Sequence, residues 1–348
     1  MSLIDYKSEF RDRILELLWR QWTTLGISGH GGRWSGAVID PEALLLFSCN
    51  LARHDARLFD AILDWLRVNG RLINVQRLKR MAAQEGFIGL EVFPAIASIT
   101  KTPELAMKWG RSAALPKLPA APPQPLFYLK NGTPLPVIRE KDPVFAAAGF
   151  LRDLYESRDV AQLFKPELPQ NLILRLRALL GVNARCEILA FLLLNERGSP
   201  RSVARNCYFF PATVSKALSE MGGSGYVLSR SEGRHRYYQI FPNTWRDLLL
   251  GDSRPAWVVW GRLFSALEQI GLFLSQDNLA DKSPLAQASA LRRILKSVTE
   301  RIEHSGITGL WGDPEAHVGE SLIPFFLTQT SALLAKLESD NYPTNSGN

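Results

Sequence analysis

Apolar side chains recur at intervals of three and four residues along much of this chain, which is the spacing of one face of an α-helix. Between residues 6 and 25 the pattern includes Phe10, Ile14 and Trp22. The same spacing predicts further helices at residues 55–68, 145–155, 172–180, 257–274, 285–302 and 321–337. We therefore expect a mainly α fold.

A proline-rich stretch interrupts the helical pattern. Eight prolines lie between Pro116 and Pro143, both included, and proline is poorly tolerated inside a helix because it lacks a backbone donor. Residues 113–144 are therefore expected to form a linker, in which Asn131 and Gly132 predict a hairpin turn between two apolar runs. The chain then divides into an N-terminal helical domain (1–112), this linker, a middle domain (145–250), a C-terminal helical domain (251–338) and a disordered polar tail (339–348).

Within the middle domain the periodicity changes in a defined order between residues 183 and 240. A helix with Asn183 as its N-cap is expected to end near Gly198, and a second, short helix to open at Ser202. A third helix covers residues 212–221, and two alternating strands within residues 226–240 are joined by a turn at 231–233. Three helices followed by a hairpin are the elements of a winged helix-turn-helix.

The segment SVARNCYFFPATVSKALSEMGGSGYVLSRSEGRHRYYQI resembles the DNA-binding domain of bacterial winged helix-turn-helix transcriptional regulators of the ArsR/MarR type. PATVSKAL resembles the start of the family's recognition helix, and GYVLSRSEGRHRYYQI resembles its wing. The resemblance implies a regulator that reads double-stranded DNA through helix 212–221 and the basic wing 226–240, and not an enzyme. Two positions depart from the family pattern: Tyr208 stands where a turn glycine is usual, and Phe210 where a serine cap is usual.

The distribution of charge supports a polyanionic partner. The formal net charge is +7, and between Arg201 and Tyr238 six Lys and Arg face only two acids, a balance of +4 within 38 residues. Such cations would neutralise phosphates and release condensed counterions. The residues expected to contact DNA are Arg201, Arg205, Ala212, Thr213, Ser215, Lys216, Ser219, Arg230, Arg234, His235 and Arg236.

Three other interpretations remain open from the sequence. The winged helix could serve as a protein-interaction or RNA-binding scaffold without DNA specificity. The glycine-rich stretch at residues 28–36 could hold Ser28 and His30 for chemistry, although it contains no G-x-S-x-G motif and is expected to be a flexible surface loop. The basic segment at residues 67–80, with Arg77 and Arg80, could belong to another helix-turn-helix-like unit, or more simply be an exposed basic helix face in a docking domain.

The remaining expectations concern partners and compartment. Cys49, Cys186 and Cys207 are far apart in sequence and are expected to be buried, reduced thiols, with a redox switch between the last two as the alternative. Clustered Cys or His ligands are missing, so we expect no metal and no cofactor. No apolar run is long enough to span a membrane, and a cytoplasmic location is expected. A bacterial homodimer is expected, with the flanking domains supplying dimerisation and effector or partner binding; the apolar residues offered for the dimer interface are Trp257, Trp260, Phe264, Leu267, Phe325, Phe326, Leu333 and Leu337.

Overall fold

The computed structural model describes residues 2–29, 32, 34–113, 122–158, 161–307, 309 and 311–339, and the chain in these ranges is mainly helical. The helices are α1 (Leu3–Leu25), α2 (Pro41–Leu51), α3 (Ala56–Asn69), α4 (Val75–Glu85), α5 (Phe93–Ile99), α6 (Ala106–Trp109), α7 (Pro143–Ala147), α8 (Leu172–Leu180), α9 (Ala184–Leu194), α10 (Pro200–Cys207), α11 (Pro211–Gly222), α12 (Pro242–Leu250), α13 (Trp260–Leu274), α14 (Pro284–Glu303) and α15 (Leu322–Glu338). The strands are β1 (Gln124–Pro125), β2 (Phe150–Leu151), β3 (Val227–Glu232) and β4 (His235–Ile240).

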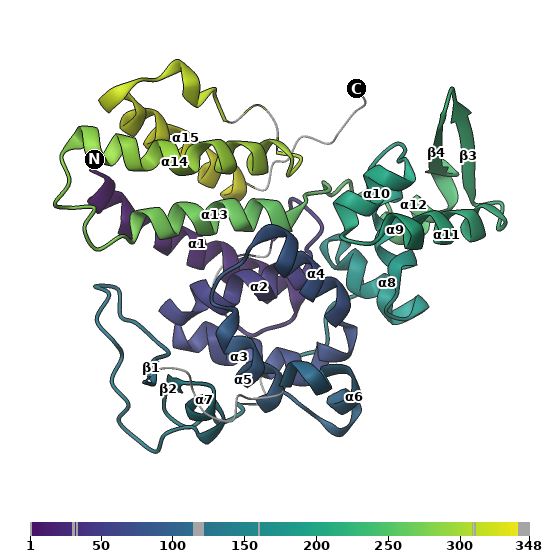
Figure 1. The fold of residues 1–348 in the computed structure, drawn as a ribbon. Coiled ribbons are helices and arrows are strands. Elements are labelled where there is room, and N and C mark those ends of the chain that lie inside the picture. Colours follow the sequence, from purple (N-terminus) through teal and green to yellow (C-terminus); the bar gives the residue numbers. More distant parts are fainter. Residues whose placement is uncertain are drawn as a thin grey trace.

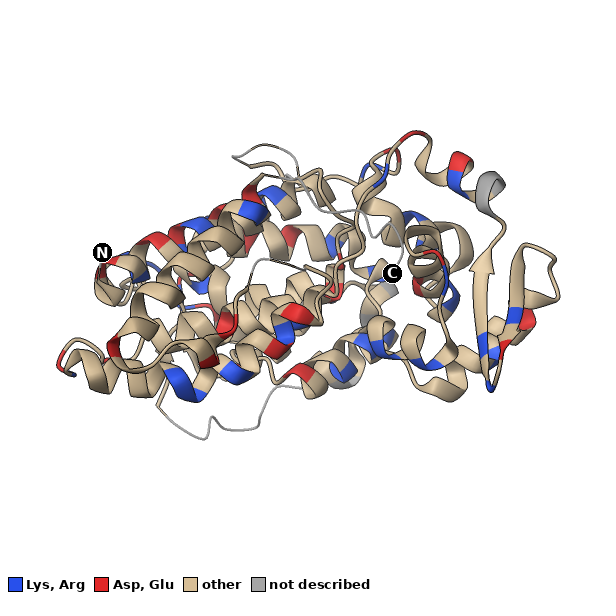
Figure 2. Cartoon of the chain, turned by 90° about the horizontal axis from the view of Figure 1, so that it is seen from above, with Lys and Arg blue, Asp and Glu red and all other residues tan. Residues whose placement is uncertain are grey.

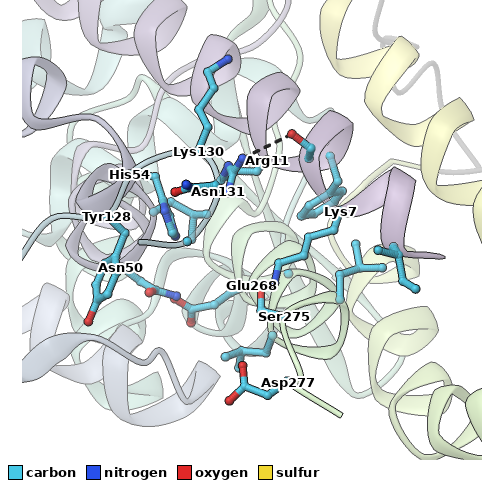
Figure 3. Close-up of a pocket in the computed structure, with 18 residues that line it drawn as sticks. Lys7, Arg11, Asn50, His54, Tyr128, Lys130, Asn131, Glu268, Ser275 and Asp277 are labelled. Carbon is cyan, nitrogen blue, oxygen red and sulfur yellow. Dashed lines mark hydrogen bonds between the residues drawn. The ribbon is translucent and has the colours of Figure 1, made fainter. Parts of the chain in front are cut away.

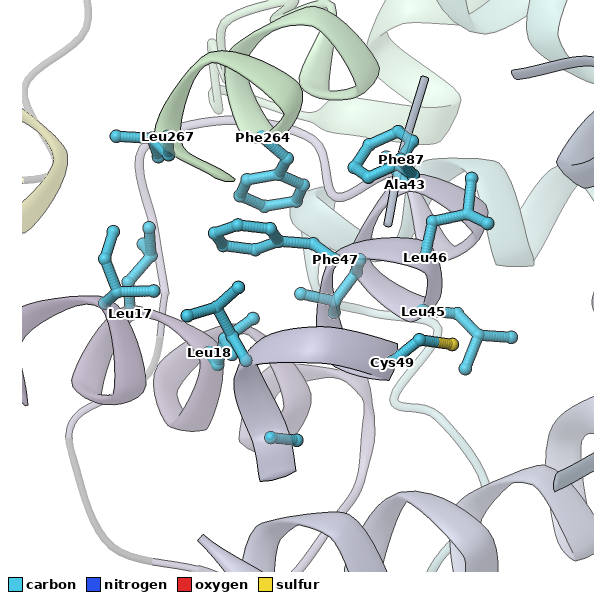
Figure 4. Packing of buried hydrophobic residues seen from close by; sticks show 14 of the residues in the cluster. Leu17, Leu18, Ala43, Leu45, Leu46, Phe47, Cys49, Phe87, Phe264 and Leu267 are labelled. Carbon is cyan, nitrogen blue, oxygen red and sulfur yellow. The ribbon is translucent and has the colours of Figure 1, made fainter. Parts of the chain in front are cut away.

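The first and last helices of the chain share one hydrophobic core. Helix α13 lies against α1 and α2, and α15 lies against α1 (Figure 1). At the centre of this core the rings of Phe47 from α2 and Phe264 from α13 stack with centroids 4.5 Å apart (Figure 4). The N-terminal and C-terminal helical domains expected from the sequence thus form one packed body in the structure.

Because α13 and α15 fill this core, most of the apolar residues expected at a dimer interface are buried inside the chain. Phe264 and Leu333 are each 0% exposed. Trp260, Leu267, Phe325, Phe326 and Leu337 are buried in the same cluster, and Trp257 packs against it while partly exposed. For the buried side chains the expectation of a contact between two copies is therefore wrong, and for the partly exposed Trp257 it stays a prediction.

A second core lies under helices α8–α11 and the β3–β4 hairpin, on one side of the molecule (Figure 1). Val203 and Ala204 of α10, Val214 and Leu218 of α11 and Val227 of β3 are among its buried members. Helices α9 and α10 begin where side chains cap them: Asn183 accepts from Arg185 N, and Ser199 accepts from Ser202 N. Helix α10 begins at Pro200, two residues before the predicted opening at Ser202, because Ser199 is the cap and Pro200 occupies the first turn, where its missing donor costs nothing.

The described part of the linker packs on the N-terminal helices. Arg53, in the short turn Ala52–His54 that follows α2, donates through Nε to Leu126 O at 2.9 Å. The chain turns at Asn131 and Gly132, where Leu129 N donates to Thr133 O at 2.8 Å. The helix expected at residues 145–155 is wrong, because α7 ends at Ala147 and β2 then pairs in parallel with β1. Gly149, with φ at +87°, turns the chain between α7 and β2.

The glycine-rich loop is anchored more firmly than a flexible surface loop would be. Trp34 is 1% exposed, its Nε1 donates to Ala37 O at 2.8 Å, and its ring meets that of Trp260 at 5.5 Å. His30, Gly31 and Arg33 lie outside the described residues, so the chemistry considered for His30 stays untested. Residues 114–121 of the linker and 340–348 of the expected disordered tail also lie outside them. Within the described ranges, every helix is too short or too polar to cross a bilayer.

Candidate nucleic-acid interface

The turn between α10 and α11 is built on Tyr208. This residue has φ at +60°, the only positive φ of a non-glycine residue in the described part of the chain, a conformation that costs free energy for a side chain with a Cβ. The structure offsets this cost by burying the ring, whose hydroxyl donates to Glu85 Oε1 at 2.8 Å. Burial, followed by the neighbouring Glu85 carboxylate, raises the pKa of Tyr208 well above its usual value, so the hydroxyl remains a donor. A tyrosine thus takes a backbone conformation that is usual for glycine.

Helix α11 has one buried face and one face of short polar side chains. Val214, Ala217 and Leu218 point into the second core. The expected contact residues Ala212, Thr213, Ser215, Lys216 and Ser219 are all exposed. Lys216 lies 4.0 Å from Glu220, which also pairs with Arg185 of α9, so negative charge on this face is confined to the last turns and is matched there by cations.

The hairpin projects from the molecule beside α11 (Figure 1). Its root is buried through Val227, Tyr238 and Ile240, and the expected contacts Arg230, Arg234, His235 and Arg236 lie exposed beyond that root. The predicted turn at residues 231–233 is corrected to Gly233–Arg234, because β3 continues to Glu232, which pairs with His235. Figure 2 shows the Lys and Arg residues of this hairpin in blue, and Glu232 is its one acidic residue.

The strand register divides the hairpin's basic side chains between its two faces. Ser231 pairs with Arg236, two residues from the Ser229–Tyr238 pair, so Arg236 shares the face of the buried Tyr238. Arg230 pairs with Tyr237 and lies on the opposite face, as does His235. Arg236 therefore extends the face that covers the helices, whereas Arg230 and His235 point away from it.

Arg201 and Arg205 are both exposed on α10. Arg205 does not lie with the expected contact residues of α11 and the hairpin. Arg205 lines an open hollow of about 310 Å³ together with Arg262 of α13 and Arg301 of α14. Its backbone oxygen accepts from Arg262 at 3.4 Å. Arg205 is thus turned toward the first body rather than toward the hairpin.

Two basic residues outside the expected set reach the same region. The guanidinium of Arg80 from α4 stacks on Phe210 at 3.5 Å, and its Nε and Nη1 find no hydrogen-bond partner among the described residues. Arg197 pairs with Glu232 at 2.5 Å and lies over the Tyr237 ring at 4.6 Å. Arg80 belongs to the basic segment at residues 67–80. No local sequence pattern predicts its contact with Phe210, which lies 130 positions away. Phe210 is 65% exposed, so its ring lies at the surface with the Arg80 guanidinium against it.

The basic segment at residues 67–80 does not form a uniformly exposed basic face. Arg77 is 1% exposed and donates through Nε to Cys207 O at 2.9 Å and through Nη1 to Glu42 Oε2 at 2.5 Å. It also pairs with Asp40. Burial acts to raise the pKa of Asp40, but the Arg77 guanidinium lowers it by more, so this pKa lies below its ordinary value. Arg77 thus ties the end of α10 to α2.

The cysteines and possible metal ligands offer no competing chemistry in the described residues. All three cysteines are buried and free of disulfides, and burial raises the pKa of Cys186 to about 11. The Cys207 thiol points toward Glu187 O at 3.6 Å. No cluster of three or more His, Cys, Asp or Glu suited to a metal ion occurs in the ranges that the structure describes.

Three features define the candidate interface: a helix face of small polar side chains, an adjacent basic hairpin, and a turn between α10 and α11 in which Tyr208 takes a left-handed conformation. No family model, curated protein or solved structure matches the chain.

Proposed function

We propose that this chain is a sequence-specific, double-stranded DNA-binding transcriptional regulator, in which α9–α11 and the β3–β4 hairpin act as a winged helix-turn-helix. One observation carries the proposal. Helix α11 and the hairpin lie side by side, and all nine of the expected contact residues that they bear are exposed and project from the rest of the chain. A helix beside a basic hairpin suits a major groove and the adjacent backbone.

The surface chemistry of α11 suits insertion in a groove. Small side chains such as Ala212 and Ser215 allow the helix backbone to approach base edges closely, while Thr213 can contact bases or phosphates. Phe210 provides no side-chain cap to the first turn of α11. The free amides of that turn can therefore donate to a phosphate oxygen.

The hairpin would follow the phosphate backbone with Arg234 at its turn and Arg236 on the face shared with the helices. Arg230, on the opposite face, would contribute less. This division follows from the strand register, and it makes the assignment testable within a single hairpin.

The test begins with duplexes selected from genomic fragments that the purified protein retains at physiological salt. Arg234→Glu with Arg236→Glu should weaken binding to all duplexes alike and flatten the slope of log Kd against log salt by about two units, because two phosphate contacts are lost. Arg230→Glu should have a clearly smaller effect. Fluorescence anisotropy over a salt series measures both.

The matched control is Arg293→Glu with Lys296→Glu, which makes the same change of net charge on two exposed residues of α14. If this control weakened binding as much as the hairpin variant, the effect would come from overall charge and not from the hairpin. Unchanged affinity of the folded hairpin variant would refute the proposed DNA contact.

One observation favours a second candidate function, a scaffold for a protein or RNA partner. Tyr226, Leu228 and Phe241 are exposed by 50%, 37% and 54% at the root of the hairpin, and exposed apolar side chains that lie together favour protein contacts. Binding of single-stranded or duplex RNA more tightly than any selected DNA, or salt-insensitive capture of one protein partner without DNA affinity, would establish this alternative instead.

A further inference from the structure

A cavity of about 510 Å³ lies in the first body, away from the proposed DNA-binding surface (Figure 3). It is bounded by the N-terminal half of α1, the end of α2, the last turns of α13 and the linker turn at Asn131 and Gly132. Its volume lies in the range of small-molecule binding pockets. The linker hairpin, which the first body holds in place, forms part of its rim.

The floor of this cavity is apolar. Phe10 of α1, Leu51 of α2 and Leu274 of α13 are buried and line it. Gly271 of α13 lies beside Phe10, where a Cβ would come within 3.4 Å of the ring. The floor therefore offers apolar contacts to a ligand.

Two polar atoms at the cavity have their hydrogen-bonding capacity unused within the described residues. His54 Nδ1 and Arg11 Nε are both buried and lack a hydrogen-bond partner there, the closest acid to Arg11 Nε being Asp12 at 4.0 Å. Arg11 is itself 8% exposed. Because buried polar groups are normally hydrogen-bonded, each such atom calls for a partner.

Three cations lie near enough to His54 to act on its imidazole. Burial, and then the charges of Arg11, Arg53 and Lys7, lower the pKa of His54 to about 4, so the imidazole is neutral at physiological pH. Lys130 also lines the cavity and pairs with Asp12 at 2.9 Å.

The acids of the cavity lie elsewhere. Asp277 is exposed at the rim. Glu268 is 2% exposed and accepts from Ile88 N at 2.9 Å and from Asn50 Nδ2 at 3.1 Å. Burial raises the pKa of Glu268 to about 7, so this carboxyl is only partly ionised near neutral pH. The charged residues that line the cavity are thus Lys7, Arg11 and Lys130 against Glu268 and Asp277.

We propose that this cavity binds an organic carboxylate with an aromatic or other flat apolar body. The carboxylate lies between Lys7, Arg11 and His54, and the apolar body lies on Phe10, Leu51 and Leu274. The carboxylate accepts from the Lys7 ammonium and from the Arg11 guanidinium, both of which line the cavity. This inference does not depend on DNA binding.

The test uses three probes of one shape and different charge with the full-length protein: 2-naphthoate, 2-naphthalenemethanol and 2-naphthylmethylamine. Calorimetry should show saturable binding of naphthoate, with the alcohol and the amine at least about tenfold weaker, because they cannot accept hydrogen bonds from the cations as a charged acceptor does. Lys7→Gln with Arg11→Gln should weaken naphthoate about tenfold or more. Lys296→Gln, an exposed change on α14, should leave it unchanged.

A second readout separates binding in the cavity from binding elsewhere. The ring signals of His54, followed by NMR through a pH titration, should show its pKa rise from about 4 when naphthoate is bound, because a nearby carboxylate favours the imidazolium. Absence of naphthoate binding, equal binding of the alcohol, tighter binding of the amine, or binding that leaves His54 unaffected would each overturn the proposal.

Discussion

Glu42 is the residue on which the contact between the two cores depends most directly. Its side chain is fully buried and accepts from Arg177 Nη1 at 2.6 Å, from Arg177 Nη2 at 2.7 Å and from Arg77 Nη1 at 2.5 Å. Arg177, on α8, also donates to Glu187 on α9 at 2.8 Å. One carboxylate from the first body thus holds two guanidinium groups, and through them the helices of the second core.

Replacing this carboxylate should be costly. Glu42→Gln leaves two buried guanidinium groups without their shared acid, and removal of one partner from a buried ion pair typically costs about 3–5 kcal/mol. Asp12→Asn is the control, because it breaks an exposed pair with Lys130 and should cost less than about 1 kcal/mol. Urea denaturation followed by circular dichroism measures both, and an equal, small loss for the two variants would contradict the role given to Glu42.

Helix α13 is the element that positions the α10–α11 turn. Its first turn contains Gly261, which lies against Tyr208: a Cβ there would come within 2.5 Å of the tyrosine hydroxyl and 2.8 Å of Cζ. The missing side chain therefore makes room for the residue that holds the turn in its left-handed conformation. The opposite end of α13 lines the cavity of the first body.

Gly261→Ala should therefore displace Tyr208 and break its bond to Glu85. Overpacking of this kind costs about 1–3 kcal/mol, which exceeds the gain of up to about 1 kcal/mol that alanine brings to a helix interior. Gly271→Ala on the same helix makes only an ordinary, if close, contact with Phe10 and should change stability by less than about 1 kcal/mol. Denaturation midpoints compare the two, and a Gly261→Ala protein as stable as Gly271→Ala would show that Tyr208 can move aside without cost.

At the scale of the whole molecule, one chain presents one α11 helix and one hairpin. A single unit of this kind reads only a short stretch of groove, and such regulators gain affinity by binding two half-sites as a symmetric dimer. We therefore propose a homodimer on DNA. The buried apolar faces of α13 and α15 cannot form its interface, because α13 already packs against α1, α2 and α14, and α15 against α1 and α14.

Light scattering coupled to size exclusion tests this assembly with full-length protein at micromolar concentration, alone and with a selected duplex. The expected mass with DNA corresponds to two chains per duplex, and the two protected half-sites should have centres about one helical turn, or a multiple of it, apart. One chain per duplex at saturation, with a single protected half-site, would exclude the dimer while leaving the DNA contact of α11 and the hairpin in place.

Local patterns in the sequence determined most of the secondary structure. The predicted helices at residues 172–180 and 285–302 match α8 and α14 closely, because helical spacing of apolar residues and capping residues such as Asn183 act within a few positions. The hairpin follows from strand alternation around Gly233 in the same way. The expected contact residues of α11 were exposed for the same local reason, since the opposite face of that helix is apolar.

Only the tertiary structure decided what covers each apolar or charged face. The periodicity predicts that Phe264 and Leu333 are buried. It does not say whether a second copy or other helices of the same chain cover them. In the same way, the local sequence does not distinguish Arg77 from an exposed arginine. Only the fold brings Asp40, Glu42 and Cys207 into contact with it. The left-handed Tyr208 and the cavity at His54 likewise depend on side chains from distant helices. Burial and hydrogen bonding between such residues depend on packing in space, which no short-range pattern in the sequence records.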